Sequence, residues 1–480
     1  MGDPTNECYS AWRDRALGEM LHDGAVSEVP ERALQVIWQH QRLDSSLRLA
    51  DGRPVRVLHP GFWNHAAGPD FRRSIISIDG GAPRCGDVEV DVRVAGWRAH
   101  GHDTNPAFAD VMLRVVWEAF DHSGATLLGL RDQLDTPWPE LRAWALREPA
   151  GDLPERLRGA CCKPMGMLDA SQRHHLLGEA GRVRLRNKSE EVTRRAGSSR
   201  WREALFLGLF TALGYKQNVW PMRRIAEAML RLELREKESQ AREELLTAMM
   251  LGLGGLIPDG WPDEDPERSE YLKRLWSLWW RLREGVSEHR LPPAIWRMDG
   301  VRPVNRPERR LALAACWLSR EDLEERLEAW ARADLKPAAA LTELWGILAT
   351  DGNRFWETRC TFTSRPMARA APLLGRSRLT ELAMNAVLPW SHARARACGD
   401  EVQIRRVEQR YLAWPKAEDN AVLRLARQRL LGMRSAGCLR GAGQQQGLLQ
   451  IVRDFCARGD ALCSGCRFPA YVEGLRRGDR

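Results

Sequence analysis

The sequence predicts a mixed α+β protein built from three consecutive parts. Residues 1–150 combine one helical pattern with several strand-like runs, residues 151–435 follow the helical period of 3.6 residues, and residues 436–480 are rich in Gly, Gln and Cys. We therefore expect an α/β domain over 1–150, an all-helical domain over 151–435, and a cysteine-cluster tail over 436–480 that packs on the rest. A length of 480 residues agrees with two or three domains.

The first part begins with a helix and continues with strands. Residues 30–43 ("PERALQVIWQHQRL") have a proline at the start and apolar residues at helical spacing. Runs typical of strands follow at 53–61, 71–81, 85–96 and 111–120, and a short one at 125–130. From residue 151 onward, long amphipathic stretches such as 306–333 predict helices, and no repeat of fixed period is found.

Charge is unevenly distributed along the chain. Residues 1–150 carry a net charge of −6, whereas the remainder carries +15. An acidic module joined to a basic one suits a metal-binding part beside a part that binds a polyanion such as nucleic acid. Solvated helix faces rich in Arg are the alternative. No apolar run of about 18 residues is present, and the first thirty residues do not resemble a secretory signal, so we expect no membrane span and a cytoplasmic protein.

Three carboxylates fall on neighbouring predicted strands. Asp70 follows a Gly-Pro turn at the head of one strand, Glu89 lies in the next, and Asp91 shares the face of Glu89 because strand side chains alternate. On adjacent antiparallel strands these carboxylates can converge on Mg²⁺ or Mn²⁺, which prefer oxygen ligands. The sequence therefore predicts a divalent-metal site.

Two histidines follow these carboxylates closely. His100 and His102 lie in "WRAHGHD", just after the third predicted strand. Such a pair can supply a metal ligand or a general base, so we count both residues among the candidate catalytic groups. Ordinary loop histidines are the alternative.

The carboxylate pattern resembles that of restriction-endonuclease-like nucleases, whose motif reads PD…(D/E)-x-K on two such strands. Pro69-Asp70 matches the first element, and Glu89-Val90-Asp91 matches the second with aspartate in place of lysine. The nearest basic residue in sequence is Arg93. The resemblance implies a nuclease-like N-terminal module, and the missing lysine leaves its ability to cleave open.

At a closer level the chain resembles a bacterial family known as domain of unknown function 2851. The similar stretches are "WQHQ" (38–41), "HPGFWNHAAGPDF" (59–71), "GDVEVDVRVAGWRAHGHDTNPAFADVMLRVVWE" (86–118), "RPVNRPERRLALAA" (302–315), "NAVLP" (385–389) and the terminal "QGLLQIVRDFC". They span nearly the whole chain. The family has no established activity, so this resemblance concerns fold and site more than function.

Four of the eleven cysteines lie in the last 43 residues. They are Cys438, Cys456, Cys463 and Cys466, and the last three form C-x6-C-x2-C. Four thiolates at such spacing can hold zinc or a [4Fe-4S] cluster, and the irregular gaps favour iron–sulfur. Four unrelated buried thiols are the alternative.

Arginines gather before a predicted helix in "RPVNRPERR". Arg302, Arg306 and Arg310 are our candidates for binding phosphate near the start of that helix, and a capping loop held by ion pairs is the alternative. Three functions thus stay open: a metal-dependent nuclease, a nucleic-acid-binding protein with a degraded nuclease site, and a metal-dependent hydrolase of another substrate.

Overall fold

A computed structural model of the chain describes fifteen segments of it. These are residues 8–22, 29–44, 46–64, 68–119, 126–145, 159–197, 200–215, 217–232, 239–260, 265–298, 301–350, 353–432, 439–456, 463 and 466–477. The expected α+β class is confirmed: a sheet occupies the N-terminal part and a long helical region follows it.

The sheet has seven strands in the order β1-β2-β4-β5-β6-β7, with β3 paired to β4. Neighbouring strands from β1 to β5 are antiparallel, whereas β5, β6 and β7 run parallel to one another. The parallel pair β5 and β6 needs a crossover, and residues 91–110 supply it with a short helix and a 3₁₀ turn. The elements are β1 (Leu47–Arg48), β2 (Pro54–His59), β3 (Phe62–Trp63), β4 (Phe71–Ile78), β5 (Arg84–Val90), α3 (Gly96–Ala99), η2 (Pro106–Phe108), β6 (Val111–Val116) and β7 (Leu127–Gly129).

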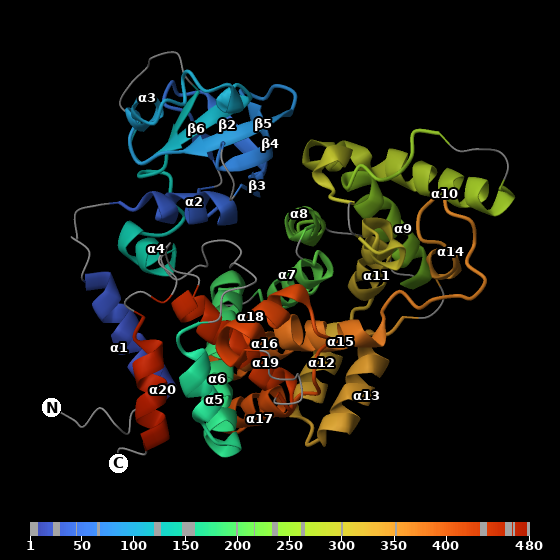
Figure 1. Ribbon diagram of the computed structural model, residues 1–480. Coiled ribbons are helices and arrows are strands. Elements are labelled where there is room, and N and C mark those ends of the chain that lie inside the picture. Colours follow the sequence, from blue (N-terminus) through green and yellow to red (C-terminus); the bar gives the residue numbers. More distant parts are fainter. Residues whose placement is uncertain are drawn as a thin grey trace. The chain divides into compact units, whose positions relative to one another are not determined.

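Two helices pack with the sheet around one apolar core. They are α2 (Glu31–His40) and α4 (Trp138–Ala145), which contact each other and lie together on one side of the strands (Figure 1). α2 places its buried apolar residues against alternate residues of the strands, among them Val88 and Val90 of β5. Because side chains alternate along a strand, Glu89 points away from this core.

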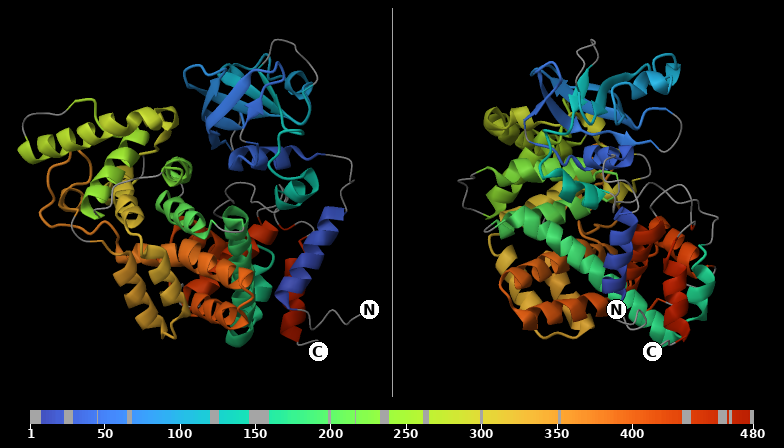
Figure 2. Two further views of the ribbon diagram at one scale, coloured as in Figure 1. Left: turned by 180° about the vertical axis from the view of Figure 1, so that it is seen from behind. Right: turned by 90° about the vertical axis from the view of Figure 1, so that its left-hand side faces the viewer.

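The ends of the described chain lie against each other. α1 (Tyr9–His22) and α20 (Phe468–Arg477) run side by side, as Figures 1 and 2 show, and the rings of Trp12 and Tyr471 stack with centroids 4.1 Å apart. Buried Arg13 donates to both carboxylate oxygens of Asp454 (2.6 and 2.9 Å), and the hydroxyl of Tyr9 donates to one of them (3.0 Å). An ion pair therefore ties the N-terminal helix to the C-terminal segment.

Further short helices surround the C-terminal segment. Contacts join α5 to both α18 and α20. Their bounds are α5 (Cys162–Met167), α18 (Ala421–Leu431) and the π-helical turn η9 (Val452–Cys456).

The helical region has its own core. The helices that pack together in it are α7 with α8, α9 with α10 and α11, and α16 with α17. Its helices are α7 (Trp201–Leu213), α8 (Val219–Leu230), α9 (Ser239–Leu253), α10 (Pro266–Leu282), α11 (Pro307–Ser319), α12 (Leu323–Arg332), α13 (Pro337–Leu348), α14 (Arg354–Thr358), α15 (Arg376–Leu382), α16 (Leu388–Ala397) and α17 (Glu401–Ala413). Shorter turns are η3 (Arg283–Gly285), η4 (Ser287–His289), η5 (Pro293–Ile295), η6 (Pro303–Asn305) and the π-helical η7 (Ala383–Val387).

The chain divides into two compact units that are not contiguous in sequence. Unit 1 combines residues 1–180, 420–435 and 448–480, and unit 2 combines 181–419 and 436–447. Two of the four boundaries fall inside α6 (Ala170–Ala196) and α19 (Ala442–Ile451), and a third lies directly before α18. The domain boundaries expected at residues 150 and 435 stay predictions, because compactness does not test independent folding. Within the described segments, no helix combines the length and the apolar character that a bilayer crossing requires.

Candidate metal centre

Asp70 and Glu89 lie beside each other on adjacent strands. The backbone N–H of Asp70 donates to Oε2 of Glu89 (3.0 Å), and Oδ2 of Asp70 accepts from the backbone N–H of Val90 (3.1 Å). Phe71 pairs with Val88 across the antiparallel strands β4 and β5, so the preceding and following residues face each other. The strand pairing therefore fixes the two carboxylates at one end of the sheet.

Helix α2 contributes two polar side chains that sequence analysis did not single out. Nε2 of Gln35 donates to Oδ1 of Asp70 (3.0 Å) and to Oε1 of Glu31 (3.3 Å). Glu31 and Gln35 are four residues apart, and residues at this spacing share a helix face. Gln35 thus holds the Asp70 carboxylate in place, and the signal that could have found it is this polar pair in an otherwise buried helix.

Burial and mutual repulsion perturb the acids. Burial raises the pKa of Glu89 to about 8, with a further contribution from the charge of Asp70. Burial also raises the pKa of Asp70 to about 6, although its hydrogen bonds from Val90 and Gln35 oppose the shift. The pKa of Asp91 is raised by burial too, against the opposing effect of both histidines. Without a cation, Glu89 is therefore mostly protonated at neutral pH.

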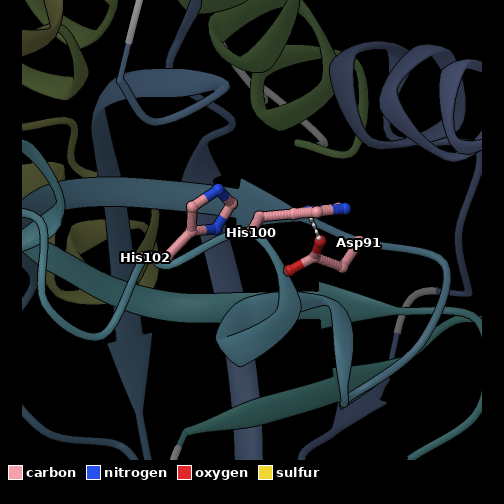
Figure 3. A group of neighbouring side chains, drawn as sticks. All are labelled: Asp91, His100 and His102. Carbon is pink, nitrogen blue, oxygen red and sulfur yellow. Dashed lines mark ion pairs between the residues drawn. The ribbon is translucent and has the colours of Figure 1, made fainter.

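Asp91, His100 and His102 form a second group next to this pair (Figure 3). One donor atom from each lies within 4.8 Å of the others. Nδ1 of His100 is 3.4 Å from Oδ1 of Asp91, and Nδ1 of His102 is 3.4 Å from Oε1 of Glu89. A carboxylate and two imidazoles at this spacing are a ligand set that suits Mn²⁺, Fe²⁺ or Zn²⁺.

Two buried polar atoms in this group, both able to bind a metal ion, have no hydrogen-bond partner within the described residues. They are Oδ2 of Asp91 and Nδ1 of His102. The contact of His102 with Glu89 is close enough for an ion pair, but its geometry is not that of a hydrogen bond. Buried polar atoms are rarely left without partners, so both atoms fit a role as ligands.

The local fold brings these side chains together by turning the chain sharply after β5. Gly96 lies so close to Asp91 that a Cβ on it would be 2.6 Å from Oδ1, so only glycine fits there without displacement. His102 stacks on Phe108 with ring centroids 4.0 Å apart, and its ring meets Trp97 edge-on. Burial lowers the pKa of His102, so its imidazole is neutral at pH 7.

A cation from the next strand lies near the carboxylates. Arg114 of β6 pairs in register with Glu89, donates to the carbonyl of Val94 (2.6 Å) and lies over the ring of Trp97. Burial lowers the pKa of Arg114, and the charges of Asp91 and Glu89 raise it. Arg93, the basic residue nearest in sequence, is exposed and lies beyond the end of β5. Arg114 was missed because the register of a parallel strand pair is not legible in the sequence.

The arginines proposed to bind phosphate differ in exposure. Arg302 is exposed and Arg306 is half-buried just before α11. Arg310 is 3% exposed, donates to Oδ1 of Asn305 and stacks over the ring of Tyr215. Burial lowers the pKa of Arg310 to about 10. Arg310 is thus buried between Asn305 and Tyr215, and its binding of phosphate stays a prediction.

Of the four predicted C-terminal cysteines, three lie in the part of the chain that the structure describes. These are Cys456, Cys463 and Cys466, and all are half-buried and reduced. Cys438 lies outside the described residues. Cys161, which sequence analysis did not select, interacts electrostatically with the other three.

Comparisons with known proteins give a family but no activity. None of the curated proteins and none of the solved structures matches the chain. A family described as "Protein of unknown function (DUF2851)" matches residues 31–421, which make up most of the chain and include every residue of the candidate metal centre. The chain therefore belongs to the DUF2851 family.

Proposed function

We propose that the protein is a metal-dependent, nuclease-like phosphodiesterase acting on DNA or RNA. The observation that carries the proposal is the gathering of Asp70, Glu89 and Asp91 in one buried group with raised pKa values. Three acids held together in this way repel one another unless a cation is bound. The motif of restriction-endonuclease-like nucleases lies on two adjacent antiparallel strands, and β4 with β5 are such a pair here.

The donor atoms fit a divalent cation. The carboxylates supply hard oxygen ligands, among them Oδ2 of Asp91, and Nδ1 of His102 offers a nitrogen ligand; neither of these two atoms has a hydrogen-bond partner within the described residues. Mn²⁺ accepts both oxygen and imidazole ligands, so it suits the mixed set better than Mg²⁺. When bound, such an ion supplies charge neutralisation for a phosphodiester and makes water more acidic.

The protein's own side chains have separate roles in this scheme. Gln35 orients Asp70 through its hydrogen bond, and exchange of such a supporting residue typically costs about 10–100-fold in activity or affinity. His102 is neutral at pH 7, so Nδ1 of its imidazole can bind an ion beside Glu89. The nuclease motif has a lysine at the position of Asp91 in this chain. Arg114, from the next strand, brings positive charge to the carboxylates instead.

The charge of the chain supports a polyanionic substrate. Residues 151–480 carry a net charge of +15, against −6 for residues 1–150. Arg302 and Arg306 remain candidates for phosphate contacts, whereas Arg310 is buried. Because each phosphate contact releases counterions, binding of DNA or RNA should weaken steeply as salt rises.

A second candidate function is hydrolysis of a different substrate. The group Asp91, His100 and His102 favours it, because two imidazoles and one carboxylate can hold an ion without Asp70. A nucleic-acid-binding protein without catalysis is the third outcome.

A nuclease assay separates these functions. Full-length protein is tested with Mn²⁺ or Mg²⁺ on linear and branched DNA and on RNA, and the variants are Asp70→Asn, Glu89→Gln and Asp91→Asn. Cleavage should need the cation and should fall by about 100-fold or more in each variant, since removing a ligand costs more than removing a supporting residue. The matched control is Asp79→Asn, which removes one charge from the exposed far end of β4 at a left-handed position that asparagine tolerates.

Each other outcome points elsewhere. Salt-sensitive binding without cleavage supports the binding protein. Absence of binding at low salt, together with Mn²⁺-dependent hydrolysis of a chromogenic ester that Asp91→Asn abolishes and Asp70→Asn leaves intact, supports the second candidate.

A further inference from the structure

Four cysteines from distant parts of the sequence gather in unit 1. Cys161 precedes α5, Cys456 ends the π-helical turn η9, and Cys463 and Cys466 precede α20. Cys161 is 4% exposed, and the other three are half-buried. α5 contacts both α18 and α20, which brings residue 161 to the C-terminal segment.

Arg429 of α18 organises this group. Its carbonyl accepts from the backbone N–H of Gly159 (2.9 Å), and its guanidinium donates to Sγ of Cys463 (3.1 Å). The backbone N–H of Ala160 donates to the same sulfur (3.3 Å). Two N–H donors therefore converge on one sulfur, and hydrogen bonds of this kind surround the sulfurs that ligate clusters.

The side chain of Arg429 is itself enclosed. It is 1% exposed, and buried cations are as a rule paired with anions. Its guanidinium also interacts with Cys456, where it lowers the pKa against the larger effect of burial. The guanidinium of Arg429 thus lies against the sulfurs of Cys456 and Cys463.

The four cysteines also interact electrostatically. Burial raises the pKa of Cys161, and Cys456, Cys466 and Cys463 each raise it further. Burial likewise raises the pKa of Cys456 to about 11 and raises that of Cys466. A bound metal would displace these thiol protons, because only thiolates are ligands.

The described cysteines do not form the tight sulfur group that a single zinc ion needs. A single zinc ion with Zn–S bonds of about 2.3 Å holds its four sulfurs about 3.8 Å apart. Among the described residues, no three cysteine sulfurs lie within 4.8 Å of one another. In a [4Fe-4S] cluster each sulfur binds a different iron, so the sulfurs are held farther apart.

We propose that Cys161, Cys456, Cys463 and Cys466 ligate a [4Fe-4S] cluster, with Arg429 as the neighbouring cation. Cys161 replaces Cys438 in the ligand set expected from the sequence. The cluster joins the start of α5 to the segment before α20 and stabilises unit 1 as a cross-link across about 300 residues. This site is separate from the residues of the proposed nuclease centre.

The test needs the full-length protein purified without oxygen and assayed for iron, acid-labile sulfide and zinc. We expect about four irons and four sulfides per chain, with absorption near 400 nm that oxidation removes. Stoichiometric zinc without sulfide, or a protein without metal, would overturn the proposal without any variant being needed.

Cysteine variants then identify the fourth ligand. Cys161→Ser should lose most of the iron and sulfide, whereas Cys438→Ser and the exposed control Cys85→Ser should keep about four of each. The proposal is wrong if Cys438→Ser loses the cluster and Cys161→Ser retains it. Should Cys161→Ser be insoluble, Arg429→Lys offers a second readout: it keeps the charge, so the cluster should remain, and its absorption and reduction potential should change.

Discussion

Binding of Mn²⁺ to the metal-free protein should release about one proton at pH 7. Asp70 and Glu89 must both be ionised to bind the cation, and the pKa values of these acids are about 6 and about 8 in the metal-free fold. A cation close to them favours the ionised forms and lowers both values. Proton release therefore reports whether the ion contacts these two carboxylates.

The pKa values determine the size of the effect. At pH 7 Glu89 is about nine-tenths protonated and Asp70 about one-tenth, which gives about one proton per cation. At pH 6 the release should rise to about 1.5 protons, and at pH 9 it should fall to about 0.1. The affinity should accordingly increase about 17-fold between pH 6 and pH 7.

Calorimetry measures this release directly. Mn²⁺ is titrated into metal-free protein in buffers of different ionisation enthalpy, and the slope of the observed heat against that enthalpy gives the number of protons. Glu89→Gln should bind more weakly and release about 0.9 fewer protons at pH 7. Asp79→Asn should match the wild type. A wild-type release below about 0.3 at pH 7, or an unchanged release in Glu89→Gln, refutes the assignment of the ion to this pair.

Three further predictions concern fold and site. Gly96→Ala should weaken Mn²⁺ binding at least tenfold without unfolding the protein, because the new Cβ displaces the Asp91 carboxylate; calorimetry and circular dichroism together check this. Asp454→Asn should destabilise unit 1 by about 3–5 kcal/mol in urea unfolding, because it removes the buried anion of Arg13 and leaves only the exposed Asp14, and Arg13→Met in the same chain should recover part of the loss. The pKa of Glu89 in the folded protein lies above its usual value of 4.5, so ionisation of Glu89 destabilises the fold. The melting temperature of the metal-free protein should therefore fall relative to that of Glu89→Gln as pH rises from 5 to 8. The same difference in melting temperature between the two proteins at pH 5 and pH 8 would contradict this.

The sheet and its acidic strands could be predicted because both depend on local patterns. Alternating residues from 71 and from 85 specify β4 and β5, and the relation of Asp70 to Glu89 follows from pairing two consecutive strands. The helix expected over 30–43 is α2, which ends at His40 because Gln41 takes a left-handed backbone with φ of 49°. The helical stretch expected over 306–333 divides into α11 and α12 between residues 319 and 323.

What could not be predicted depends on contacts between distant residues. The strand expected to reach residue 96 ends at Val90, although alternation continues beyond it, because the chain turns there to bring His100 and His102 to Asp91. Arg114 requires knowledge of a parallel register, and Cys161 lies about 300 residues before the cysteines it joins. Such pairings follow from the packing of the whole unit, and no local period encodes them.

The ion pair between Arg13 and Asp454 also has a consequence for synthesis of the protein. Its two residues are 441 positions apart, so the first helix is made long before its partner leaves the ribosome. The sheet, whose strands lie between residues 47 and 129, can form early in translation from neighbouring segments alone. Until then, the aromatic residues Tyr9 and Trp12 of α1 lack the contact with Tyr471 that covers them in the folded protein. Unit 1 can therefore be completed only after residues 454 to 477 have emerged from the ribosome.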